Sequence, residues 1–165
     1  MAKLATDLEP IVKNIPYTDL RTIMRNKAKL STIKNIEHLG KTKGIFYFQN
    51  YHNKNAKPWF YNKNISRELA VTINRCRSGH NNLKESLFKI NVIQDPLCQC
   101  GASVENLNHI VWQCHLFDQQ RINLIQELSK CKQYLPLDIT TFLVKPNIYI
   151  MRLINKFLQN CNIRI

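Results

Sequence analysis

The densest chemistry in the sequence is a group of three cysteines and one histidine within seventeen residues. Thiolates and imidazole nitrogens are ligands that Zn²⁺ prefers, and three thiolates with one imidazole are typical of a four-coordinate structural site. Gly101 follows the second cysteine, and a glycine there lets the chain turn back through a positive φ. The sequence therefore predicts a Zn²⁺ site whose four ligands are Cys98, Cys100, His109 and Cys114.

The spacing of these ligands places a condition on the site. One residue separates the first two thiols, where two to four are the commoner spacing in zinc sites. His109 and Cys114 are five residues apart, which is about 140° around an ideal helix. Both can reach one ion only if the helix ends or distorts near Gln113, and His115 is an alternative ligand. The cysteines could instead be buried thiols, because free cysteine is among the most buried residue types.

Amphipathic segments around the cluster predict the elements that position it. Apolar residues recur at helical spacing over 66–78, 82–90, 117–131 and 147–161. Gly79 is a natural stop for the first of these helices, and Asn82 with Glu85 resembles a capping pair for the second. Ser103 or Glu105 is expected to open the helix that carries His109. The remaining cysteines, Cys76, Cys131 and Cys161, fall on apolar faces and are assigned to the core.

The region before residue 65 is predicted to hold two helices and a loop. Residues 2–13 have apolar residues at helical spacing, and Thr18 or Asp19 can cap a longer helix that follows. The segment Ile45–Phe48 is aromatic and strand-like, and residues 50–64 are polar apart from an aromatic cluster at Trp59. The fold class expected is mainly α: a small helical bundle with a zinc-knuckle-like turn and helix, and at most a short strand element.

Charge is distributed unevenly along the chain. Lys and Arg outnumber Asp and Glu by 24 to 11. Residues 13–90 hold sixteen basic residues and four acidic ones, a net charge of +12, whereas residues 91–165 hold seven and five, a net charge of +2. Such a basic half favours a polyanionic partner. Nucleic acid is favoured over an acidic lipid surface, because no basic amphipathic helix has a Trp/Phe/Leu face.

The sequence lacks the signals of membrane insertion and secretion. No stretch approaches the roughly 20 apolar residues that cross a bilayer, and the N-terminus has no apolar signal-peptide core. We therefore expect an intracellular protein, cytoplasmic or nuclear, whose cysteines are reduced. A catalytic zinc is not expected, because Glu105 is the one acid after the 98–101 turn that could serve as a general base near an open site.

The order of several segments resembles the region downstream of the ribonuclease H domain in arthropod non-LTR (LINE-type) retrotransposon polyproteins. Residues 73–80, INRCRSGH, resemble an R-x-R-[TS]-G-H segment of that family. Residues 95–101, DPLCQCG, and 108–114, NHIVWQC, resemble the elements that follow it. Residues 15–20 and 58–60 resemble recurring upstream elements, and Ala2–Ala5 looks like the last helix of the ribonuclease H domain.

The resemblance implies a non-catalytic, zinc-dependent fragment that binds RNA or DNA largely without regard to sequence. The acidic active sites of ribonuclease H and of reverse transcriptase have no counterpart here. The implied organisation is a ribonuclease H remnant (1–14), a basic helix and aromatic loop (15–64), a zinc-binding module (65–131) and a helical tail (132–165). The residues expected to contact nucleic acid are Arg21, Arg25, Arg75, Arg77, His80 and Lys84.

Two other functions are compatible with the same residues. The helices could form a protein-interaction module that docks on the polymerase or ribonuclease H part of the polyprotein, or on host proteins. The chain could also be a relic of an inactivated element. Polynucleotide binding that depends steeply on salt would separate the first reading from these two.

Overall fold

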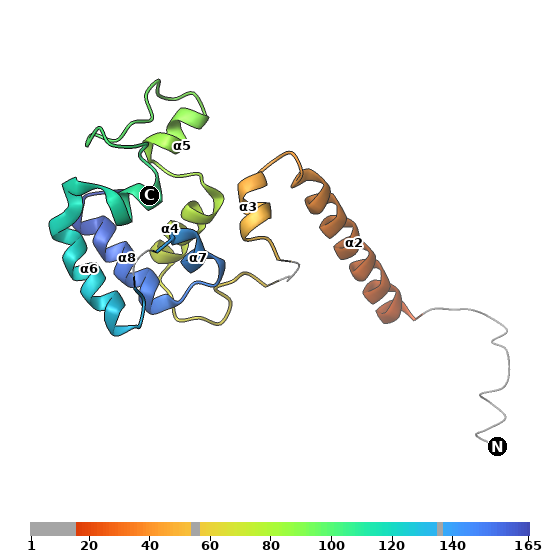
Figure 1. Ribbon diagram of the computed structural model, residues 1–165. Helices are drawn as coiled ribbons and strands as arrows, with labels where there is room; N and C mark the ends of the chain where they lie inside the picture. The colour runs from red at the N-terminus through yellow and green to blue at the C-terminus, as the bar shows by residue number, and fades with distance from the viewer. Residues whose placement is uncertain (1–15, 54–56, 135–136) are drawn as a thin grey trace, which may run out of the picture. The chain divides into compact units, whose positions relative to one another are not determined.

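The computed structural model of the chain describes residues 16–53, 57–134 and 137–165. It divides into two compact units, Met1–Lys43 and Gly44–Ile165. The helix of the first unit is α2 (Tyr17–Leu39), and the second unit contains α3 (Ile45–Asn50), α4 (Arg67–Ser78), α5 (Lys84–Lys89), a π-helical turn (His109–Gln113), a 3₁₀ turn (His115–Phe117), α6 (Asp118–Lys130), α7 (Ile139–Val144) and α8 (Ile148–Asn160) (Figure 1). The predicted helical fold class is confirmed. The one β pairing in these described ranges is an isolated bridge between Leu97 and Val104.

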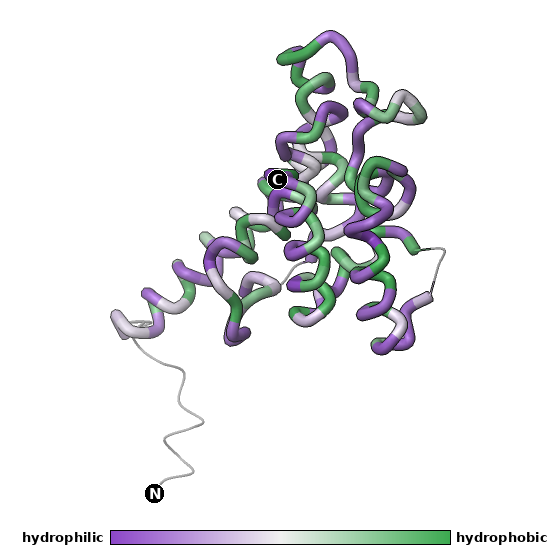
Figure 2. The backbone as a smooth tube through the Cα atoms, turned by 90° about the vertical axis from the view of Figure 1, so that its left-hand side faces the viewer, coloured by the Kyte–Doolittle hydropathy of each residue, from purple (hydrophilic) through white to green (hydrophobic). Residues whose placement is uncertain are grey.

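Helix α2 is long and exposed along its whole length. Hydrophilic and hydrophobic residues are interleaved along it (Figure 2), and none of its residues is buried. Pro16 is the N-cap, so the prediction that Thr18 or Asp19 caps this helix is wrong; both lie in its first turn. The helix predicted over 2–13 lies outside the described residues. None of the described helices is long and apolar enough to cross a membrane.

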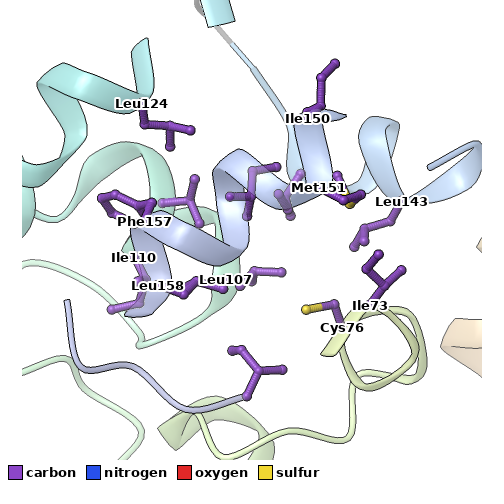
Figure 3. Packing of buried hydrophobic residues seen from close by; sticks show 14 of the residues in the cluster. Ile73, Cys76, Leu107, Ile110, Leu124, Leu143, Ile150, Met151, Phe157 and Leu158 are labelled. Atoms are coloured by element: carbon purple, nitrogen blue, oxygen red, sulfur yellow. The ribbon is translucent and has the colours of Figure 1, made fainter. Parts of the chain in front are cut away.

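The core of the second unit forms where α8 packs against α6 and α4 (Figure 3). Each helix turns one apolar stripe inward, as the spacing predicted. Ser66 caps α4 by accepting a hydrogen bond from the Leu69 N–H at 3.2 Å, and Gly79 ends α4 with a φ of 66°. Asn147 caps α8 in the same way as Ser66 caps α4. The core residues that these three helices contribute include Leu69, Ile73, Leu124, Leu128, Ile154, Phe157 and Leu158.

Segment 45–48 is helical, so the strand-like interpretation is wrong. Its β-branched and aromatic residues favour strands only where they can pack on a pleated surface. Here they form the first turns of α3, which contacts α4. Tyr51, just after α3, is buried against that neighbour and accepts a hydrogen bond at its carbonyl from Arg77. Tertiary packing therefore overrides local propensity in this segment.

The ends of the second unit's elements differ from prediction in two further places. Leu83, and not Asn82, is the N-cap of α5, and the neighbouring Asn81 carboxamide accepts from the Leu83 N–H at 3.1 Å. Phe88 and Ile90 were expected to face inward but are exposed.

The predicted boundaries at 64/65 and 131/132 both lie inside the second unit. Residues 137–165, expected in a tail, supply much of its core through α7 and α8.

Candidate metal centre

Four side chains from two neighbouring segments converge in the second unit. The ligand atoms of Cys98, Cys100, His109 and Cys114 all lie within 4.8 Å of one another. The Sγ atoms of Cys98 and Cys114 are 3.7 Å apart, and Sγ of Cys100 is 3.1 Å from Nε2 of His109. None of the three cysteines in the cluster forms a disulfide; each is a free thiol. This group could therefore hold a metal ion, as the sequence predicted.

The first two thiols project from a tight turn. The Gly101 N–H donates to the Cys98 carbonyl at 2.9 Å, and Gly101 has a φ of 74°. Backbone hydrogen bonds close the base of the loop, from the Cys98 N–H to the Ser103 carbonyl and from the Glu105 N–H to the Pro96 carbonyl, each 2.9 Å long. One residue between Cys98 and Cys100 is therefore enough to bring both thiols into the cluster, because the loop turns back directly after Cys100.

Replacing Gly101 with alanine should lower the free energy of unfolding by about 1 kcal/mol, the cost of a left-handed conformation for a residue with a Cβ. Nothing lies within 4 Å of the position that a Cβ would take, so the cost comes from the backbone alone. Chemical denaturation of the metal-loaded protein measures it. Gly101→Asn is the matched control and should lose less, because asparagine tolerates positive φ. Equal or greater stability of Gly101→Ala would show that the turn does not need this conformation.

The other two ligands are brought together by the π-helical turn. The Cys114 N–H donates to the His109 carbonyl at 2.7 Å, an i to i+5 hydrogen bond that places the two residues one turn apart. Cys114 itself has an extended backbone, so the helix ends there. The condition set by the five-residue spacing, a helix that distorts or ends near Gln113, is therefore confirmed.

Asn106 opens this helical segment, so the prediction of Ser103 or Glu105 is wrong. The Asn106 carboxamide accepts from the His109 N–H at 2.9 Å. Asn108, one residue before His109, accepts from the Ile139 N–H at 2.9 Å and donates to the Asp138 carboxylate at 3.1 Å. Its side chain thus ties the ligand-bearing turn to the start of α7.

Arg121 supports the cluster from α6, and sequence reasoning missed it. Its guanidinium is 5% exposed and donates to the carbonyls of Ile110 (3.2 Å), Val111 (2.8 Å) and Cys114 (2.6 Å), and it pairs with Asp118. Carbonyls at the end of a helix have no partner within the helix, so these bonds complete the π-helical turn. A signal was present: Arg121 lies three residues before Leu124 and seven before Leu128, on the buried stripe of α6.

The environment of the cluster favours a neutral imidazole at His109 and a thiolate at Cys100, two of the protonation states that a metal needs. Burial, and then the positive charge of Arg121, lowers the pKa of His109. The Ala102 N–H donates to Sγ of Cys100 at 3.4 Å and lowers the pKa of that thiol. Burial raises the pKa of Cys114 to about 12. Of Cys100 and Cys114, Cys100 therefore becomes a thiolate more readily.

The other candidate ligands stay outside the cluster. His115 is exposed at the start of the 3₁₀ turn. Among the residues that the structure describes, it is not part of the metal cluster. Cys76 is a buried core residue and Cys161 packs, half-buried, against the core, as predicted. Cys131 is the half-buried C-cap of α6 and does not belong to the core cluster, so its assignment to the core is not confirmed. Burial raises the pKa of Cys76 to about 12 and that of Cys161 to about 11.

The residues expected to contact nucleic acid differ in their exposure and in their partners. Arg77 is 2% exposed, donates to the Tyr51 carbonyl at 3.0 Å and lies against the rings of Tyr47, Tyr51 and Trp59, so its predicted contact with a polyanion is wrong. The ammonium of Lys84 donates to the Leu97 carbonyl at 2.8 Å, where it braces the metal-binding loop. The side chains that remain exposed are those of Arg21, Arg25, Arg75 and His80.

Comparison of the chain with protein-family models, with curated proteins and with solved structures found no match. The functional argument therefore depends on the residues and their geometry.

Proposed function

We propose that this chain is a non-catalytic, zinc-dependent nucleic-acid-binding fragment of a retrotransposon reverse transcriptase/ribonuclease H polyprotein. The observation that carries the proposal is the convergence of three thiols and one imidazole from a loop and a π-helical turn. These are the four residues that the resemblance to LINE-type polyproteins implies as ligands. The polyanion partner follows from the net charge of +13.

The ligand set favours zinc. Thiolates select soft or borderline metals over Mg²⁺ and Ca²⁺, and three thiolates with one imidazole suit tetrahedral Zn²⁺. Zn–S bonds of about 2.3 Å in a tetrahedron separate two sulfurs by about 3.8 Å. The sulfurs of Cys98 and Cys114 are 3.7 Å apart, and the widest separation in the cluster is at most 4.8 Å. Small side-chain rotations would therefore close the four atoms on one ion.

A structural role for the metal fits this site better than a catalytic one. Four protein ligands fill a tetrahedral shell, whereas catalytic zinc keeps a position open for water or substrate. The nearby carboxylate of Glu105 accepts a hydrogen bond from the Lys84 N–H at 3.2 Å, which fixes it at the start of α5. The metal would then hold the 96–105 loop and the π-helical turn together.

Binding of a polynucleotide should weaken steeply as salt is added. Basic side chains that neutralise phosphates release counterions, so the logarithm of the binding constant falls linearly with the logarithm of salt concentration, with a slope of about −0.9 per phosphate contact on duplex DNA. Fluorescence anisotropy of a labelled oligonucleotide, measured from 50 to 200 mM salt with the zinc-loaded chain, gives that slope. The same titration after chelation of the metal should show weaker binding, because the metal no longer stabilises the unit that carries the basic side chains. Binding that is insensitive both to salt and to chelation would contradict the proposal.

One observation favours a protein-interaction module as the second candidate. Helix α2 exposes large apolar side chains, of which Leu20, Ile23 and Met24 are 45%, 50% and 57% exposed. Exposed apolar residues of this kind mark interaction surfaces when they gather. Saturable binding of the zinc-loaded chain to the polymerase or ribonuclease H part of the polyprotein, lost on Ile23→Ser, together with no affinity for any polynucleotide, would establish this alternative.

A further inference from the structure

A wide cleft lies between α4 and the segment that follows α8. Its volume is about 1040 Å³, which reaches the upper end of the range for small-molecule pockets. Three arginines line it: Arg67 and Arg75 from α4, and Arg164 from the end of the described chain. The cleft shares no lining residue with the metal cluster. It is therefore a second place at which this unit could bind a ligand.

The charge of the cleft is strongly positive. Glu68 is the one acidic side chain that lines it, against three guanidinium groups. The Glu68 carboxylate accepts from the Gln159 amide at 3.4 Å. Arg75 donates to the main-chain oxygen of Ile165, whereas Arg67 and Arg164 form no ion pair with a described carboxylate, and an anionic ligand would supply their counterion.

The arrangement of these arginines suits an extended anion. Residues 67, 71 and 75 follow one another at intervals of four along α4, so Arg67 and Arg75 lie about two turns apart on the side of α4 that lines the cleft. Eight residues of helix separate them by about 12 Å. That length corresponds to three or four charges of one nucleic-acid strand at roughly 3.4 Å each. Nη1 of Arg75 donates a hydrogen bond to the main-chain oxygen of Ile165 at 2.7 Å, which fixes the orientation of the Arg75 guanidinium.

We propose that this cleft binds the phosphate backbone of a nucleic acid; the inference rests on the proposed function and gives it a site. Guanidinium forks match phosphate oxygens in pairs. Amide side chains also line the cleft, and these are among the groups that hydrogen-bond to phosphates and sugars. The amides are those of Asn82, Asn155, Gln159 and Asn162.

The composition of the cleft predicts readout without sequence preference. No aromatic side chain lines the cleft, so bases have no ring on which to stack. Contacts to the backbone position a nucleic acid but carry no sequence information. The side chains of Arg77 and Lys84 form hydrogen bonds within the protein. The phosphate contacts predicted for these two residues are therefore assigned to the residues of the cleft.

The test is a double variant, Arg67→Gln with Arg164→Gln, in the zinc-loaded full chain. Both side chains are exposed and form no ion pair with a described carboxylate, so the fold should be unaffected. Affinity for a labelled 20-nucleotide oligonucleotide should fall at least about tenfold, because charge-assisted bonds to phosphate are lost. The slope of the logarithm of the binding constant against the logarithm of salt concentration should become less steep by about 1.4 to 1.8, because two phosphate contacts are lost.

Two matched variants make the result specific. Lys145→Gln with Lys156→Gln removes the same charge from exposed positions outside the cleft, and affinity should change by about twofold at most. Arg67→Lys with Arg164→Lys keeps the charge but not the fork, and it should lose less affinity than the glutamine variant, so the further loss in the glutamine variant can be assigned to charge in the cleft rather than to misfolding.

The outcomes separate the cleft from the proposed function. If the wild-type chain binds no oligonucleotide, the proposed function is wrong. If the wild type binds and the two glutamine double variants lose affinity equally, nucleic acid binds elsewhere and the cleft proposal is overturned. Displacement of the oligonucleotide by poly-glutamate, as effectively per charge as by unlabelled oligonucleotide, would also overturn it in favour of an acidic polypeptide.

Discussion

Cys100→Ser is expected to abolish metal binding and to lower the free energy of unfolding by more than about 4 kcal/mol, a size that few single substitutions reach and that loss of a metal can produce. The hydroxyl is a far weaker ligand than the thiolate, and the bound metal is the one link we infer between the 96–105 loop and the π-helical turn at this point. Metal content by atomic emission and thermal unfolding by circular dichroism measure the two effects.

Cys161→Ser is the matched control, because it makes the same chemical change at a half-buried thiol outside the cluster. Its metal content should equal that of the wild type. Equal metal retention in the two variants would show that Cys100 is not a ligand, and equal loss would show that the metal binds elsewhere in the chain.

Arg121→Met is expected to lower the free energy of unfolding by about 3 to 5 kcal/mol and to weaken metal binding by about 10- to 100-fold. Methionine keeps much of the side-chain length and the helix propensity but removes every donor. The carbonyls of Ile110, Val111 and Cys114 would then be left without the partner that completes the turn. Denaturant unfolding and competition with a chromophoric chelator measure these effects.

Arg152→Met on α8 is the corresponding control. Arg152 is exposed and makes one hydrogen bond, to the Asn64 carbonyl at 3.1 Å. Its replacement should change stability by no more than about 0.5 kcal/mol and leave metal affinity unchanged. If the Arg121 and Arg152 variants unfold at the same denaturant concentration, the π-helical turn holds its shape without Arg121.

The helices that position the site could be predicted where pattern and caps agree. In α4, α6 and α8 the apolar stripe has helical spacing, and Ser66 and Gly79 mark both ends of α4. The segment 45–48 has the composition of a strand, but it forms the first turns of α3, which packs on α4 and places Tyr47 beside Arg77. Local propensity cannot carry that information.

The ligand set could be predicted from residue type, and a break in the helix near Gln113 from the spacing of His109 and Cys114, but the π-helical form of that break could not. Nothing in the sequence HIVWQ distinguishes a π-helical turn from an α-helical one, because the difference depends on the ring of hydrogen bonds that Arg121 completes ten residues later. The predicted contacts of Arg77 failed for a related reason. Its charge indicated a surface residue, whereas three aromatic rings and the Tyr51 carbonyl provide a buried site for the guanidinium.

X-ray absorption at the zinc edge of the purified, zinc-loaded chain tests the convergence of Cys98, Cys100, His109 and Cys114 on one ion most directly. We expect one zinc per chain, with three sulfurs at about 2.3 Å and one nitrogen at about 2.0 to 2.1 Å. A shell of oxygen and nitrogen alone, or a chain that retains no zinc, would contradict the metal centre and the function proposed from it.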